Sequence, residues 1–118
     1  MRAMAMKVKA ICRYAKISPR KARLVSELVR GKSVNDALEI LRTTPKRAAV
    51  MIDKTLRSAL ANAEETMEGD VDALRVSEIR VDGGPVRKWH WARPRGMWAP
   101  LKRRTSHITI VLSDEHKR

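Results

Sequence analysis

The stretch VRKWHWARPRGMWAPLKRR, residues 86–104, constrains the fold most, because it combines properties that normally exclude each other. It holds seven Lys or Arg side chains, no acid and all three tryptophans of the chain. Large aromatic side chains usually lie inside a protein, whereas dense charge of one sign usually stays in water. An apolar core that took in this stretch would bury unpaired charge. The stretch is therefore expected to project from the core that the other residues form.

The charge of the whole chain predicts a polyanionic partner. The formal net charge is +13, and it is unevenly placed: residues 1–30 carry net +8, residues 31–80 net −1 and residues 81–104 net +6. Two basic segments on either side of a neutral middle are typical of a nucleic-acid-binding protein rather than of a uniform solubility coat. A membrane surface is the weaker alternative, because no basic amphipathic helix stands apart from the expected core.

Length and composition predict one domain, residues 1–118, with a core of its own. The single cysteine, Cys12, cannot form an intramolecular disulfide and gives no zinc site, which is consistent with a reducing cytosol. No apolar run approaches the roughly 20 residues of a membrane span, and the first residues lack a signal-peptide core. We therefore expect no membrane partner, no export signal, no metal and no cofactor.

The first thirty residues predict a strand and a helix. Residues 6–14 alternate with a period of two, with a mostly basic face opposite the side formed by Met6, Val8, Ala10, Cys12 and Tyr14. A helix then begins at Ser18-Pro19 and ends at Gly31, with Ser18 as its predicted cap. Its predicted apolar face consists of Ala22, Val25, Leu28 and Val29, and its opposite face of Arg20, Arg23, Glu27 and Arg30.

Two further helices are predicted from residue 33 to about residue 66. Ser33 and Asp36 resemble a capping box before the stripe Val34, Ala37, Leu38 and Leu41. Thr44-Pro45 is expected to open the third helix, whose apolar stripe is Ala48, Ile52, Leu56, Ala59 and Ala63. The acidic residues 64–72 lack the ligand spacing of a calcium loop, so they are interpreted as a solvated helix end and turn.

The last third of the chain predicts two strands with a long connection. Residues 74–82 form one strand, with a bulge near Ser77–Glu78 where the apolar pattern changes phase. Residues 105–113 form the other, with Ile108, Ile110 and Leu112 on the core side. The predicted fold class is α+β: a small antiparallel sheet packed on three helices. Residues 83–104 are much longer than an ordinary hairpin loop, which has about two to five residues. They are therefore predicted to form a projecting β-hairpin arm of roughly 30 Å.

RNA is the partner that suits such an arm. Phosphates neutralise Lys and Arg, and indole rings stack on unpaired bases or pack against sugars. Trp89, near the base of the arm, could instead close the hairpin against the helices, whereas Trp98 lies among residues typical of a turn.

Four segments resemble one family of ribosomal proteins. They are VDGGPVRK (81–88), KRRTSHITIVLSD (102–114), ISPRKARLVSELVRGKSVNDALEIL (17–41) and KRAAVMIDKTLRSALANAE (46–64). Together they are similar to the bacterial-type large-subunit ribosomal proteins numbered twenty-two. The segment WHWARPRGMWAP departs from the pattern, because the family usually has more Arg and fewer Trp there.

The resemblance implies a structural constituent of the large ribosomal subunit in the cytoplasm. Such a protein binds large-subunit ribosomal RNA, aids subunit assembly and lines the polypeptide exit tunnel with its hairpin arm. The implied partners are that RNA, neighbouring ribosomal proteins and the nascent polypeptide, with no homo-oligomer.

Charge, position and resemblance together give the predicted site. The predicted RNA-binding residues are Lys7, Lys9, Arg13, Lys16, Ser18, Arg20, Lys21, Arg23, Arg87, Lys88, Trp89, Trp91, Arg93, Arg95, Lys102, Arg103, Arg104, Ser106 and His107. The predicted tunnel-facing tip consists of Arg93, Arg95, Gly96, Met97 and Trp98.

Two other functions fit the sequence less well. A helix-turn-helix DNA-binding protein could use residues 18–41. Its DNA-reading helix, however, would carry the acidic residues Asp36 and Glu39 and only one basic residue, Arg42. An enzyme is rejected, because adjacent Ser106 and His107 point to opposite faces of a strand and no phosphate-binding loop is present. No catalytic residue is predicted.

Overall fold

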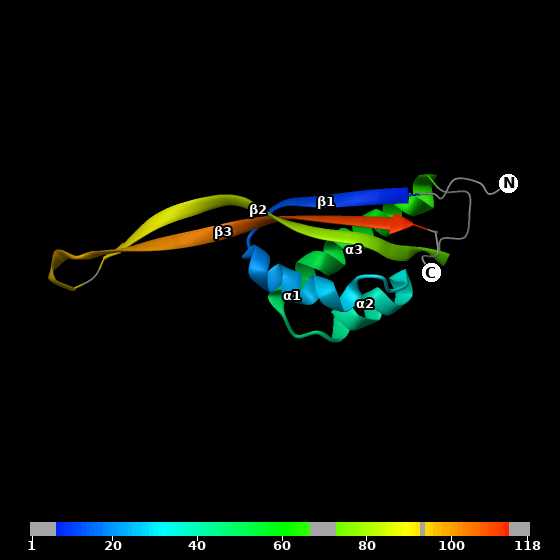
Figure 1. Cartoon of the computed structure of the whole chain (residues 1–118), viewed down its shortest axis with the longest axis horizontal. Helices are drawn as coiled ribbons and strands as arrows, with labels where there is room; N and C mark the ends of the chain where they lie inside the picture. Colours follow the sequence, from blue (N-terminus) through cyan, green and yellow to red (C-terminus); the bar gives the residue numbers. More distant parts are fainter. Residues whose placement is uncertain (1–6, 67–72, 93, 114–118) are drawn as a thin grey trace.

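The computed structural model describes residues 7–66, 73–92 and 94–113. In these ranges three helices cover one face of a three-stranded antiparallel sheet with the strand order β1-β3-β2 (Figure 1). The predicted α+β class and the predicted order of elements are confirmed. The elements are β1 (Lys7–Ala15), α1 (Pro19–Val29), α2 (Val34–Thr43), α3 (Arg47–Thr66), β2 (Arg75–Ala92) and β3 (Trp98–Ser113).

The core lies between the sheet and the helices. In the sheet, Ile110 of β3 pairs with Ala10 of β1 on one side and with Ile79 of β2 on the other, and all three side chains are buried. The predicted stripe of α3 is confirmed, since all five of its residues are buried. Three of those five are alanines, and their small side chains let the helix backbone lie close to the sheet.

The predicted alternation of β1 fails at its end. Val8 and Ala10 are buried as expected, but Tyr14 is 62% exposed and Ala15 is buried instead. The cause is a register shift between Cys12 and Ala15 against β3, with Tyr14 at a φ of 58°. A bulge places an extra residue in one strand and therefore reverses the side-chain phase beyond it. Met6, predicted for the same strand, lies outside the described residues.

Helix α1 begins and ends as predicted, but two details are corrected. Ser18 occupies the N-cap position with an extended backbone, yet its side chain makes no capping hydrogen bond. Leu28 is 46% exposed rather than buried, and Ser26 lies in the core in its place. Burial of the Ser26 hydroxyl is tolerated because it donates a hydrogen bond of 2.9 Å to the Arg23 carbonyl.

The junction between α2 and α3 also differs from the prediction. Ser33 caps α2 as expected, accepting a hydrogen bond from the Asp36 N–H. Thr44, however, ends α2 instead of opening α3: its N–H and its hydroxyl both donate to the Ile40 carbonyl. The residue before a proline is disfavoured in the helical region, so Thr44 is extended and α3 begins only at Arg47.

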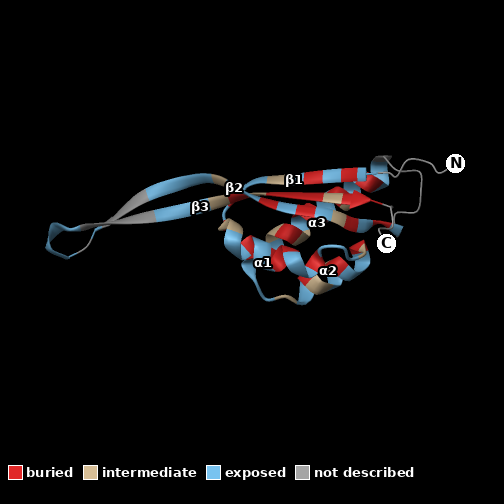
Figure 2. Cartoon of the chain, in the orientation of Figure 1, coloured by how far each residue is buried: buried red, intermediate tan, exposed pale blue. Residues whose placement is uncertain are grey.

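Strands β2 and β3 run without interruption from the body into the arm. The predicted hairpin arm is confirmed, and its two legs are continuous with the strands of the body: β2 has 18 residues and β3 has 16, and they pair to Ala92 and Trp98. The predicted bulge is confirmed as a register shift between Val76 and Glu78. The molecule measures 72 × 26 × 25 Å, and the burial that marks the body gives way to exposure along the arm (Figure 2).

The acidic segment 64–72 lies outside the described residues from residue 67 onward. Among the helices described, none has the length and apolarity that crossing a bilayer requires.

Candidate nucleic-acid interface

In the ladder of the arm, residues 83–104, two successive pairs place like charges opposite each other. Arg87 pairs directly with Arg103, and Lys88 pairs with Lys102. Because successive residues of a strand point to opposite faces, one cationic pair lies on each face of the ribbon. All four side chains are exposed. Like charges placed opposite each other destabilise a two-stranded ribbon. The arm sequence holds no Asp or Glu that could compensate.

The tip of the arm is a five-residue connection between Ala92 and Trp98, with a 3-10 turn, η2, at Pro94–Gly96. Arg95 and Gly96 both have positive φ angles, 65° and 70°. A non-glycine residue in this region costs roughly 1–2 kcal/mol, so the turn holds Arg95 in an unfavourable conformation. Met97 beside it is 66% exposed. Arg93, predicted for the tip, lies outside the described residues.

The side chains of Trp89, Trp91 and Trp98 also lie outside what the structure describes. Their backbones are in the ladder, where Trp89 pairs with Leu101, Trp91 with Ala99 and Trp98 with Ala92. This places all three tryptophans in the seven paired positions between the bulge at the base and the tip.

A second basic surface runs along β1 on the sheet face that the helices leave uncovered. Lys7, Lys9 and Arg13 are exposed, as the alternation predicted, and Lys16 beyond the strand is exposed as well. Helix α3 covers the opposite face, where Val8 and Ala10 are buried. Strand β1 therefore has an apolar side for the core and a mostly cationic side for a partner, on which Ile11 is also exposed.

The start of α1 joins this surface to the arm. Arg20 and Lys21 in its first turn are exposed, and that turn has no acidic residue. The N–H groups of a first turn have no intrahelical acceptor and carry the positive end of the helix dipole. Because Ser18 does not cap them, they add to the charge of the two side chains. Pro19 lies against the base of the arm: a Cβ on Gly83 would be 3.9 Å from its Cγ.

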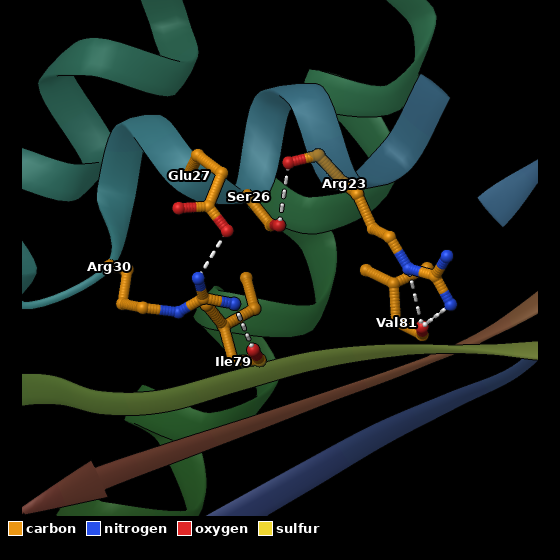
Figure 3. A network of polar contacts seen from close by, with 6 residues as sticks. All are labelled: Arg23, Ser26, Glu27, Arg30, Ile79 and Val81. Carbon is orange, nitrogen blue, oxygen red and sulfur yellow. Dashed lines mark hydrogen bonds and ion pairs between the residues drawn. The ribbon is translucent and has the colours of Figure 1, made fainter. Parts of the chain in front are cut away.

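Two arginines of α1 have a structural role that the sequence did not reveal (Figure 3). The Arg23 guanidinium donates two hydrogen bonds, of 3.2 and 2.9 Å, to the Val81 carbonyl of β2. Arg30 donates one of 2.9 Å to the Ile79 carbonyl and also pairs with Glu27. Both thus occupy the outer edge of β2. Arg23 was predicted to bind RNA, and its guanidinium is already committed to this edge.

The first part of that edge is covered by the backbone between α1 and α2. The Gly31 N–H donates to the Val76 carbonyl, the Val76 N–H donates to Lys32, and the Val34 N–H donates to Leu74. The unpaired edge of a sheet is a site for aggregation unless it is blocked. The sequence carried no local signal for this, because the partners lie about 40 to 58 positions apart along the chain.

Ser106 and His107 point to opposite faces as predicted; the RNA-binding role predicted for Ser106 is wrong, whereas that of His107 stays a prediction. The Ser106 side chain is fully buried and donates a hydrogen bond of 2.6 Å to the Ile17 carbonyl, so it is not on the surface predicted to meet RNA. The sequence did contain a signal for the burial of Ser106, because Ser106 lies on the same side of the strand as Ile108 and Ile110. His107 is partly exposed, and its Nδ1 accepts a hydrogen bond of 3.1 Å from the Tyr14 N–H.

Comparisons with known proteins agree with this geometry. The family model described as Ribosomal protein L22p/L17e matches residues 10–113. A protein named large ribosomal subunit protein uL22 from Pelotomaculum thermopropionicum is 49% identical over 110 residues, covering 93% of this chain and 97% of that protein.

Two further relatives bear the same name. The protein from Syntrophobacter fumaroxidans is 50% identical over 93% of this chain and 100% of its own length. The protein from Desulfitobacterium hafniense is 52% identical over 91% of this chain and 94% of its own length. These relatives are named as ribosomal proteins, so the prediction that the chain is not an enzyme is confirmed. The chain belongs to the L22p/L17e family of ribosomal proteins.

Proposed function

We propose that this chain is a structural constituent of the large ribosomal subunit that binds large-subunit ribosomal RNA through its arm and the adjoining body surface. The observation that carries the proposal is the ladder of like charges, Arg87 opposite Arg103 and Lys88 opposite Lys102, on an arm without acids. Phosphates on both faces of the ribbon would turn each repulsive pair into two favourable contacts.

The body supplies the second part of the binding surface. Arg20 and Lys21 lie beside the base of the arm, and Lys7, Lys9 and Arg13 follow β1 away from it. In this proposal they anchor the body to the RNA surface while the arm enters between RNA segments. Arg23 supports the surface by fixing α1 to β2, and Ser106 supports it from inside the core.

The finer part of the proposal concerns the tip. The tip would face the polypeptide exit tunnel, with Arg95, Gly96 and Met97 next to the nascent polypeptide, and the body would contact neighbouring ribosomal proteins and aid assembly. Support comes from the elongated shape, 72 Å along its longest axis, and from the exposure of Met97. Family membership gives the location, the cytoplasmic large ribosomal subunit.

Site-specific crosslinking tests this placement. A photoreactive amino acid at Met97 in assembled large subunits that carry a nascent chain should crosslink to both ribosomal RNA and nascent polypeptide. The same group at Val50, which is 56% exposed on α3 of the body, is the control and should not reach the nascent chain. Crosslinks from Met97 to neither RNA nor nascent chain would contradict the proposal.

The helix-turn-helix alternative is not favoured. Its reading helix would be α2, where Asp36 and Glu39 are exposed. The N-terminal end of α2 is also tied to the edge of β2 through the Val34 N–H. Acidic side chains next to phosphates are poor chemistry for a helix in the major groove.

A further inference from the structure

The base of the arm has two bulges on opposite sides of β3. Between the pairs Gly83–Ser106 and Val86–Arg104, β2 places two residues against one residue of β3. Between the pairs Cys12–Ile108 and Ala15–Ser106, β1 does the same. The residues of β3 opposite the two bulges are Thr105 and His107. Bulges bend a strand and increase its twist, so the sheet changes direction where it narrows from three strands to two.

His107 connects the two bulges. On the β1 side it accepts the hydrogen bond of 3.1 Å from the Tyr14 N–H, and the two rings meet edge to face with centroids 4.9 Å apart. On the β2 side its Nε2 and Cε1 lie 3.3 Å from the position that a Cβ on Gly84 would occupy. One side chain of the central strand thus contacts both flanking strands where the arm leaves the body.

Two further hydrogen bonds hold the same place. The Thr105 hydroxyl donates a bond of 2.7 Å to the Pro85 carbonyl inside the β2 bulge. The Ser106 hydroxyl donates one of 2.6 Å to the Ile17 carbonyl just before α1. Pro85 has no N–H to leave unpaired, so it suits a bulged position. The arm is therefore joined to β1, to α1 and to its own second strand at successive residues of β3.

Gly84 is the residue that this arrangement requires. A Cβ there would lie 2.5 Å from the Thr105 Oγ1, closer than atoms can approach without displacement. A Cβ on the neighbouring Gly83 would lie 3.9 Å from Pro19, an ordinary contact. Neither glycine has a positive φ. The requirement at Gly84 is thus one of space, not of backbone conformation.

We infer that Gly84, closed over Thr105 and His107, is a positioning residue that fixes the direction of the arm before any RNA is bound. An arm whose direction is already set loses less freedom on docking than one that pivots at its base. The inference rests on the proposed function only for its consequence, which is RNA affinity. The fixed direction itself is a property of the free protein.

Distance measurement between two spin labels tests the fixed direction directly. With Cys12 replaced by Ala, cysteines at Met97 and at the exposed Ser58 of α3 carry the labels on the free chain. Gly84→Ala should shift or broaden the distance distribution, because either β2 moves away from Thr105 or Thr105 gives up its hydrogen bond to the Pro85 carbonyl. Gly83→Ala is the matched control and should leave the distribution unchanged. Identical distributions for Gly84→Ala and the parent protein would overturn the inference.

A rescue variant separates positioning from general damage. Thr105→Ala removes the atom that the new Cβ meets, so the double variant Gly84→Ala with Thr105→Ala should recover most of the parent distance distribution. The double variant also provides a test if Gly84→Ala alone folds poorly. Failure of the double variant to recover it, with a folded body, would count against the proposed contact.

RNA binding gives a second and independent readout. Gly84→Ala should weaken binding to large-subunit ribosomal RNA several-fold while the salt dependence of affinity stays the same, since no phosphate contact is removed. A reduced salt slope would mean that contacts were lost instead of misdirected. If the parent protein failed to bind this RNA, the proposed function would fall, whereas the distance result on the free chain would still stand.

Discussion

The same two strands, β2 and β3, form both the body and the arm, and the two halves are stabilised differently. In the body, Ile79 pairs with Ile110 and Val76 with Leu112, and these side chains are buried beneath helices. In the arm, the corresponding pairs are Arg87 with Arg103 and Lys88 with Lys102, and they are exposed. The backbone ladder continues from one half to the other while the side-chain contribution changes sign.

The difference shows that strand pairing alone does not determine where a protein is stable. An isolated two-stranded ribbon is marginal in water, and a hydrophobic face is what normally stabilises it. The body has that face, whereas the described pairs Arg87–Arg103 and Lys88–Lys102 of the arm are charged and exposed. The body is thus expected to hold its structure by itself, whereas the arm has its direction set at its base and gains further stability from a polyanion.

The largest effect is expected from a cavity in the body. Ile110→Ala removes a side chain that is 1% exposed at the centre of the sheet. Such a truncation should lower the free energy of unfolding by about 2–5 kcal/mol, measured by chemical denaturation. A loss below about 1 kcal/mol would mean that the core assigned here is not the one that stabilises the chain.

The matching change in the arm should leave the body folded. Replacing residues 88–102 by Asn-Gly keeps the pair Arg87–Arg103 and closes it with a favoured two-residue turn. The same denaturation measurement should show a cooperative transition. Its absence would contradict the division into a self-supporting body and a dependent arm.

A smaller effect is expected when one arm cation is removed. Arg103→Ala should weaken binding to large-subunit ribosomal RNA and lower the slope of log affinity against log salt by about 1, because one phosphate contact is lost. Lys54→Ala, an exposed lysine on α3, is the control and should leave the slope unchanged. Equal slopes for the two variants would show that Arg103 makes no phosphate contact.

A still more local effect is expected at the tip. Gly96 has a φ of 70°, and no atom of the described part of the chain lies within 4 Å of the Cβ position that a substitution would fill. Gly96→Ala should destabilise only the turn, by about 1 kcal/mol, through its backbone conformation. Hydrogen exchange should rise at the amides next to residues 94–97 and stay constant in β1. A rise in the body would show that arm and body unfold together.

Much of the body could be predicted from local patterns. The spacing of apolar residues identified the stripe of α3 and the core side of β3, and the phase change at Ser77–Glu78 marked a bulge that the structure confirms. The exposure of Tyr14 could not be predicted, because its position in the sequence continues the alternation of β1. The bulge that exposes it arises from pairing with β3, about 90 residues away.

The charge of the candidate site could be predicted from the sequence, but its hydrogen bonds could not. Exposure of Lys7, Lys9 and the arm cations followed from alternation and from the absence of acids. The hydrogen bonds of Arg23 and Arg30 to β2 did not, because a surface arginine on a helix looks the same whether it meets solvent, RNA or a carbonyl across the fold. Gly84 belongs to the sequence Gly-Gly-Pro, but only the structure shows that Gly84, unlike Gly83, has no room for a Cβ.

The most direct test of the central claim reverses one charge of the ladder. Arg87→Glu places a carboxylate opposite Arg103, so hydrogen exchange at the arm amides of the free protein should slow, reflecting about 0.2–1 kcal/mol of added stability. Affinity for large-subunit ribosomal RNA should fall in the same variant, and by more than in Lys54→Glu, which changes the net charge equally. Unchanged exchange in the arm, together with an affinity no lower than that of Lys54→Glu, would contradict the account.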